Sequence, residues 1–74
     1  METVEVFKTN VENQNHAKML INRIHETFID YQANFDLEDC DKILRVKCPG
    51  EDIRSSCLIK LLNESGFNAE VLPD

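Results

Sequence analysis

Polar and apolar residues alternate along the first segment of the chain. Val4 and Val6 flank Glu5, and this period of two predicts a strand over residues 3–9. Val4, Val6 and Lys8 then share one face of the strand, so we expect Lys8 to start on the inner face of a sheet, beneath the loop that follows.

The next segment changes to the period of an amphipathic helix. Its apolar residues recur at spacings of three and four, which predicts a helix near 13–28 with either Asn10 or Asn13 as its N-cap. The predicted buried stripe is Ala17, Leu20, Ile21, Ile24 and Phe28.

Alternation returns in two consecutive segments, which predicts a hairpin between residues 31 and 48. The inward residues of its two strands are Tyr31, Ala33, Phe35 and Leu37, and then Leu44, Val46 and Cys48. If Leu37 pairs with Leu44, Asp39 pairs with Lys42, and the turn is Cys40-Asp41. Cys40 is then expected at the exposed tip of the hairpin.

Pro49-Gly50 interrupts the chain and introduces a second predicted helix, near 51–65. Glu51 and Asp52 suit its first turn, where carboxylates meet the positive end of the helix dipole. Its expected buried stripe is Ile53, Cys57, Leu58, Leu61 and Leu62. Gly66 is expected as the left-handed residue that ends the helix, with Phe67 as the following hydrophobic contact, before a short strand over 68–72.

The predicted element order is β-α-β-β-α-β in a single domain of 74 residues. This order indicates an α+β, ferredoxin-like sandwich: a four-stranded antiparallel sheet with two helices on one face. In that fold the first strand–helix loop, the hairpin tip and the last helix–strand turn lie at one end. We therefore expect residues 8–13, His16, Cys40 and Phe67 to be near neighbours.

Composition narrows the class of protein. There is no long apolar run, and residues 1–5 are acidic without a following apolar region, so we expect a cytoplasmic protein with no membrane segment and no signal peptide. The net charge of −6 argues against nucleic acid as a partner. We find no nucleophile–base pair, phosphate loop or carboxylate dyad, and therefore expect neither an enzyme nor a cofactor.

The three cysteines, Cys40, Cys48 and Cys57, match neither an even disulfide set nor the close pairs of a zinc site. We expect reduced thiols, at least two of them in the core. Cys40 is also a candidate reactive thiol, but Glu38, Asp39 and Asp41 around it disfavour the thiolate. A simply exposed thiol is the favoured interpretation.

Two stretches of the chain carry a family resemblance: Lys8-Thr9-Asn10-Val11-Glu12-Asn13 and Gly66-Phe67-Asn68-Ala69-Glu70-Val71. They resemble the motif Met-Thr-Cys-x-x-Cys and the C-terminal pattern of the heavy-metal-associated (HMA) domain family of copper chaperones and metal-ATPase modules. The chain also looks like short stand-alone bacterial proteins that share the departure from the motif. Thr9 matches, whereas Lys8 replaces the methionine, and Asn10 and Asn13 replace both metal-binding cysteines.

The resemblance implies a binding loop made of Lys8, Thr9, Asn10 and Asn13. Soft metals such as Cu(I) need thiolates, so two neutral amides beside an ammonium do not reproduce the two-cysteine clamp. Roles as a cap and a turn residue are favoured for the two asparagines over ligand contacts. For Lys8, anion binding at the helix N-terminus competes with the favoured alternative, a stem over the core edge and a pair with Glu12 or a hairpin acid.

Two function classes follow from the resemblance. The first is a non-enzymatic interaction module whose partner is another protein or a second copy, with pairing through the outer strands 31–37 and 68–72. The second is a metal carrier that uses Cys40, His16 and acidic side chains as substitute ligands. His25 is expected at the edge of the first helix, with no ligand role.

Overall fold

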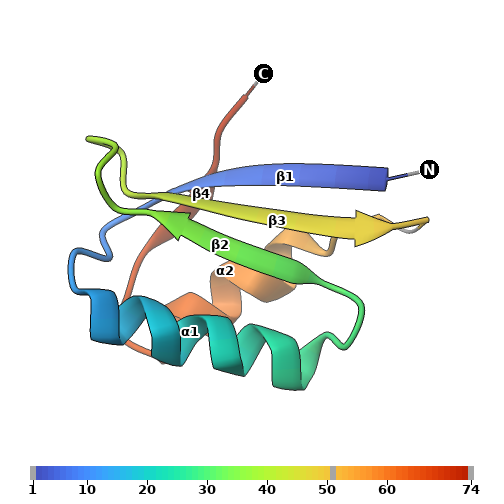
Figure 1. The fold of residues 1–74 in the computed structure, drawn as a ribbon, viewed down its shortest axis with the longest axis horizontal. Coiled ribbons are helices and arrows are strands. Elements are labelled where there is room, and N and C mark those ends of the chain that lie inside the picture. The colour runs from blue at the N-terminus through green and yellow to red at the C-terminus, as the bar shows by residue number, and fades with distance from the viewer. Residues whose placement is uncertain (1, 51, 74) are drawn as a thin grey trace.

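A computed structural model describes residues 2–50 and 52–73. Its elements, in chain order, are β1 (Glu2–Thr9), α1 (Gln14–Thr27), β2 (Gln32–Asp36), β3 (Ile43–Pro49), α2 (Ser55–Glu64) and β4 (Ala69–Val71). The strands form one antiparallel sheet in the order β2-β3-β1-β4, and both helices lie on the same face of this sheet (Figure 1). The predicted ferredoxin-like α+β fold is confirmed.

The core lies between the sheet and the two helices. The predicted inward positions of α1, β2 and β3 hold: Ala17, Leu20 and Ile24 of α1 are buried, and Ile21 and Phe28 pack against them. Leu44, Val46 and Cys48 are fully buried on β3. Neither helix of the described chain has the length and apolar content that a bilayer crossing requires.

The predicted parity of β1 is wrong. Phe7 is fully buried and Thr9 nearly so, whereas Val4 is 44% exposed and Lys8 lies on the outer face. The sequence Val4-Glu5-Val6-Phe7 ends in two adjacent apolar residues, so it allows either face to point inward. The aromatic ring removes more apolar surface from water than a valine does, and its burial decides the parity.

The predicted hairpin register is also wrong, by two residues. Leu44 pairs with Phe35 and Ile43 with Asp36, so the connection spans residues 37–42 and is longer than a two-residue turn. Because the shift is even, every side chain keeps its predicted face. Lys42 closes the loop with a positive φ of 50°, and its backbone N–H donates to the carbonyl oxygen of Asp39 at 3.0 Å.

The second helix begins at Ser55, later than predicted. Ile53 is buried ahead of the helix, and the backbone N–H of Arg54 donates to the Tyr31 hydroxyl at 2.9 Å, which anchors the entry. Asp52 therefore precedes the helix, and the predicted position of Glu51 lies outside the described residues.

The predicted stripe of α2 holds except at Cys57. Leu58 and Leu62 are buried and Leu61 packs against the core, but Cys57 is exposed. The expectation that at least two thiols fill the core is wrong, because Cys48 is buried while Cys40 and Cys57 are exposed.

The end of α2 follows the prediction. Gly66 has a φ of 94°, a left-handed conformation that glycine adopts without a side-chain clash. The N–H of Phe67 donates to the carbonyl of Leu62 at 2.9 Å and that of Gly66 to Asn63 at 3.1 Å, the pair of bonds of a Schellman motif. Phe67 then packs on the core, and the chain turns directly into β4.

Candidate functional site

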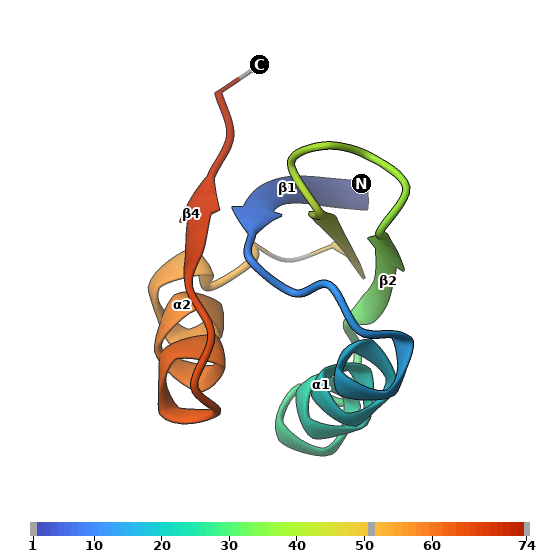
Figure 2. The ribbon, with the colours of Figure 1, turned by 90° about the vertical axis from the view of Figure 1, so that its left-hand side faces the viewer.

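Three connections meet at one end of the molecule, as predicted. The loop after β1, the hairpin loop 37–42 and the turn between α2 and β4 face the viewer in Figure 2. The N–H of Asn68 donates to Asn10 Oδ1 at 2.8 Å, and the rings of His16 and Phe67 lie with centroids 5.3 Å apart. The hairpin joins the same end through the N–H of Thr9, which donates to the carbonyl of Asp41 at 3.1 Å.

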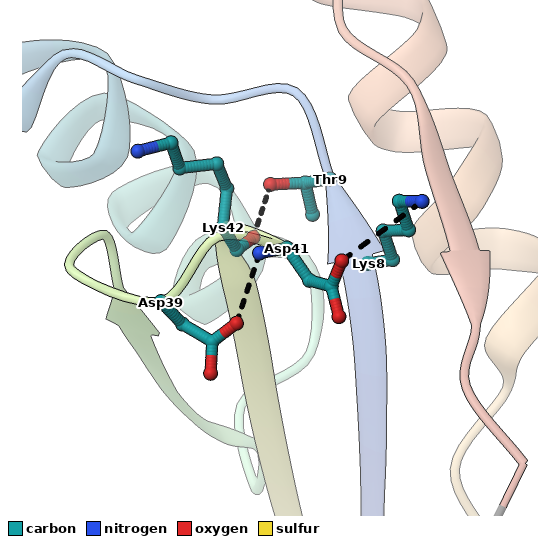
Figure 3. Close-up of polar contacts among 5 residues, drawn as sticks. All are labelled: Lys8, Thr9, Asp39, Asp41 and Lys42. Carbon is teal, nitrogen blue, oxygen red and sulfur yellow. Dashed lines mark hydrogen bonds and ion pairs between the residues drawn. The ribbon is translucent and has the colours of Figure 1, made fainter.

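Thr9 fixes the first loop to the hairpin. Its hydroxyl donates to the carbonyl oxygen of Lys42 (Figure 3). The same hydroxyl accepts from the backbone N–H of Val11, which is 3.2 Å away. Thr9 is buried, and the side chain of Val11 inserts fully into the core. Thr9 therefore holds the loop to its neighbours, with its hydroxyl donating one hydrogen bond and accepting another.

Asn10 extends the sheet beyond the end of β1. β1 pairs with β4 through Lys8 opposite Glu70 and Thr9 opposite Ala69, so the next pair in this register is Asn10 with Asn68. There the side-chain oxygen of Asn10 accepts the N–H of Asn68, in place of a backbone carbonyl. The side-chain amide of Asn10 thus supplies one more hydrogen bond between the two strands, at the point where the backbone leaves β1.

Asn13 is the N-cap of α1. Its side-chain oxygen accepts from the backbone N–H of Asn15 at 2.7 Å and of His16 at 3.4 Å. Its own extended backbone, with φ −100° and ψ 131°, is the conformation of an N-cap residue. The cap is therefore Asn13, one of the two positions that the sequence allowed.

Lys8 does not lie beneath the loop. It leaves β1 on the outer face with half of its side chain exposed, and its ammonium nitrogen is 3.9 Å from Asp41 Oδ1 (Figure 3). The predicted position on the inner face is wrong because it followed the wrong parity, but the predicted pair with a hairpin acid is present. An exposed pair of this kind contributes only about 0–1 kcal/mol to stability.

The hairpin tip gathers three potential metal ligands, Asp39, Cys40 and Asp41. Their ligand atoms lie within 4.8 Å of one another. Asp39 Oδ1 already accepts the backbone N–H of Asp41 at 2.9 Å, and Asp41 also faces Lys8. His16 does not belong to this cluster, because its ring packs on Phe67 at the other side of the shared end.

His25 has a bond that the sequence did not predict. Its Nε2 accepts the backbone N–H of Ala33 from the outer edge of β2, at 3.3 Å. The bond joins this side chain of α1 to the backbone of the outer strand. The helical position of His25 gave no signal of this role, because the partner is a backbone group set by tertiary packing.

Sequence reasoning also missed the residues that receive the loop. Asp41 and Lys42 accept from Thr9 through their backbone carbonyls, and Asn68 donates its backbone N–H to Asn10. Backbone groups carry no residue-type signature. The hairpin register, which was predicted two residues away, places Asp41 and Lys42, and the pairing of β1 with β4 places Asn68.

The surface of the described residues has hollows at the shared end and between the helices. A shallow one of about 240 Å³ lies at the shared end and is lined by Lys8, Thr9, Asn10, Asn68, Ala69 and Glu70. A larger one of about 540 Å³ lies away from the loop, between the helices. Its lining includes charged side chains of both signs (Arg23, Glu26, Lys60 and Glu64) and the side chains of Phe28, Cys57 and Leu61. The loop residues thus border the smaller of these hollows.

Comparisons with protein-family models, curated proteins and solved structures gave no match.

Proposed function

We propose that this chain is a small, non-enzymatic protein-binding module of the HMA type, in which the metal loop has become a structural connection. The observation that carries the proposal is the use of the two loop amides. Asn10 Oδ1 accepts from Asn68, and Asn13 Oδ1 accepts from Asn15 and His16. Both oxygens, at the positions of the two family cysteines, are therefore committed to backbone N–H groups of the chain itself.

The chemistry of these positions supports the same conclusion. An amide oxygen is a neutral, hard donor, and a soft metal selects thiolates. A loop fixed by Thr9, Asn10 and Asn13 also lacks the freedom to wrap an ion without breaking hydrogen bonds. The surface features that support binding to another protein are the two outer strands and the strongly acidic net charge. The acidic charge favours a basic partner.

A metal carrier is the second candidate, and the hairpin cluster of Asp39, Cys40 and Asp41 favours it. In this alternative the thiol and the two carboxylates bind a divalent ion. His16 can join them only if its ring moves away from Phe67. The Lys8 ammonium beside Asp41 opposes such binding, because it repels a cation and occupies one carboxylate.

Titration with Cu(I) and Zn²⁺ under reducing conditions separates the two candidates. If the chain is a binding module, neither metal should form a tight one-to-one complex with it. The wild type and Cys40→Ser should then capture the same protein from the native cell. A sub-micromolar complex that Cys40→Ser abolishes, without a protein captured by either chain, would replace the proposed function with the metal carrier.

A further inference from the structure

The two free edges of the sheet differ in how many hydrogen-bonding groups they leave open. In an antiparallel ladder alternate residues direct their N–H and C=O groups to the neighbouring strand, and the residues between them direct theirs outward. β2 and β4 are the outer strands, so each has one edge without a strand beside it. An open edge is the place where an extended chain can add to a sheet.

The edge of β2 is covered in part by the chain itself. The N–H of Tyr31 donates to the carbonyl of Phe28 at 3.2 Å, and the N–H of Ala33 donates to His25 Nε2 at 3.3 Å. Both acceptors come from α1 or its end, so the helix engages two N–H groups in the first half of this edge. Within β2 the C=O of Ala33 and both backbone groups of Phe35 remain directed outward.

The edge of β4 has a short open window. Leu72 donates to the carbonyl of Val6 at 2.9 Å and Asn68 to the Asn10 side chain, so the even-numbered residues face β1. Ala69 and Val71 therefore direct their N–H and C=O groups outward. The window is bounded on one side by Phe67, whose N–H is bonded to Leu62, and on the other by Pro73, which has no N–H.

We propose that this window, Ala69 to Val71, binds an extended basic segment of another protein by strand addition. The inference rests on the proposed function and names the surface and the partner chemistry. Four backbone hydrogen bonds, two to Ala69 and two to Val71, fix the added strand. Val71 is 41% exposed, so an apolar side chain of the partner can contact it across the new pair.

Charge identifies the partner as basic. Glu70, the central residue of the window, is exposed, and its cross-strand neighbour Lys8 places its ammonium beside Asp41 instead. In the described chain Glu70 has no ion pair, so a Lys or Arg opposite it supplies the missing cation. The chain's net charge of −6 attracts the same kind of segment at longer range.

A second copy of the chain fits the window poorly. The antiparallel register that uses Ala69 and Val71 of both copies sets Glu70 directly opposite Glu70, and like charges at that spacing are destabilising. Shifting the register by two residues in either direction brings in Phe67, whose N–H is engaged, or Pro73, which has none. The occupant is therefore a different, basic chain.

The test is selection of random nine-residue peptides displayed on phage against the wild-type protein. We expect the retained peptides to alternate β-branched residues with Lys or Arg. Val71→Pro removes an outward donor without touching a bond to β1, and should weaken their binding about tenfold or more. The matched control, Val71→Ala, keeps the N–H and should change binding much less. Glu70→Lys should lose the basic peptides and retain acidic ones.

Amide exchange of the wild-type protein with a retained peptide gives a readout that does not depend on the variants' stability. The amides of Ala69 and Val71 should become protected, while that of Phe35 stays unchanged. Peptides that Val71→Pro binds equally well, or no retained peptide at all, would overturn the proposed edge. In that case, capture of a partner from the native cell would still support the proposed function, although not through this edge. A wild-type dimer that Val71→Pro abolishes would show a second copy as the occupant and overturn the basic partner.

Discussion

At the scale of single residues, the two loop asparagines do structural work that their side-chain length makes possible. The short amide of Asn13 reaches the first turn of α1, and that of Asn10 reaches the backbone of Asn68 across the end of the sheet. Cysteine at either position offers no comparable acceptor, because sulfur is a weak one. The two amides therefore hold the loop through hydrogen bonds that cysteines would not supply.

The N-cap gives the first prediction. Asn13→Ala leaves the N–H groups of Asn15 and His16 without their acceptor and should reduce the free energy of unfolding by about 1 kcal/mol. Urea denaturation measures the change. Asn13→Asp, which keeps an oxygen at the cap, and Asn15→Ala, an exposed helical site, are the controls. A loss for Asn13→Ala no larger than that for Asn15→Ala would contradict the capping role.

Lys8 gives the second prediction. Because its ammonium lies on the outer face beside Asp41, Lys8→Met should leave the unfolding free energy within about 0.5 kcal/mol of wild type. The variant with Asn10→Cys and Asn13→Cys should acquire Cu(I) binding, with the same affinity whether or not Lys8→Met is added. A clear gain in Cu(I) affinity on adding Lys8→Met would place the ammonium at the loop.

At the scale of elements, the molecule protects one edge of its sheet with a helix side chain. His25 is on α1, and the bond to Ala33 joins the helix to β2 at the open side of that strand. Exposed edges invite pairing between molecules, and an engaged N–H cannot take part in it. The arrangement restricts intermolecular pairing to what β4 and the far part of β2 allow.

Removal of this bond is the third prediction. His25→Ala should speed hydrogen exchange of the Ala33 amide and leave the amides of β1 unchanged, because the lost acceptor serves only the edge. His25→Gln, which keeps an acceptor on a side chain of similar reach, is the control. Equal exchange of the Ala33 amide in the wild type and His25→Ala would show that the imidazole does not protect the edge.

At the scale of the whole molecule, packing sorts three chemically identical thiols into different environments. Cys48 is sealed between the sheet and the helices, Cys57 opens into the hollow between α1 and α2, and Cys40 lies at the hairpin tip. A buried thiol is inert towards reagents in water, and an exposed one reacts.

Thiol titration tests this sorting as the fourth prediction. In the native protein an aromatic disulfide reagent should modify two thiols rapidly, and the third only after unfolding. The variant with Cys40→Ser and Cys57→Ser should then show no rapid reaction, whereas Cys48→Ser should leave both rapid sites and lower stability by about 1–3 kcal/mol. A single rapid thiol in the wild-type protein would contradict the exposure of Cys57.

The sequence by itself determined the order of elements, the ferredoxin-like fold, the inward faces of α1, β2 and β3, and the end of α2 at Gly66. These features depend on local periodicity and on residues with special backbone freedom, both of which can be read from neighbouring positions. The meeting of the three loops at one end also followed, since it is a property of the fold.

Tertiary structure alone decided the rest. Either Phe7 or Val6 can lie on the inner face of β1, and the packing of the whole core buries the ring of Phe7. The hairpin register differs by two from the prediction, and in this register Asp41 and Lys42 bind Thr9 through their backbones, an interaction between residues far apart in sequence. The same holds for Asn10 and Asn68, and for His25 and Ala33. Each is a bond to a backbone group, which the residue type does not reveal.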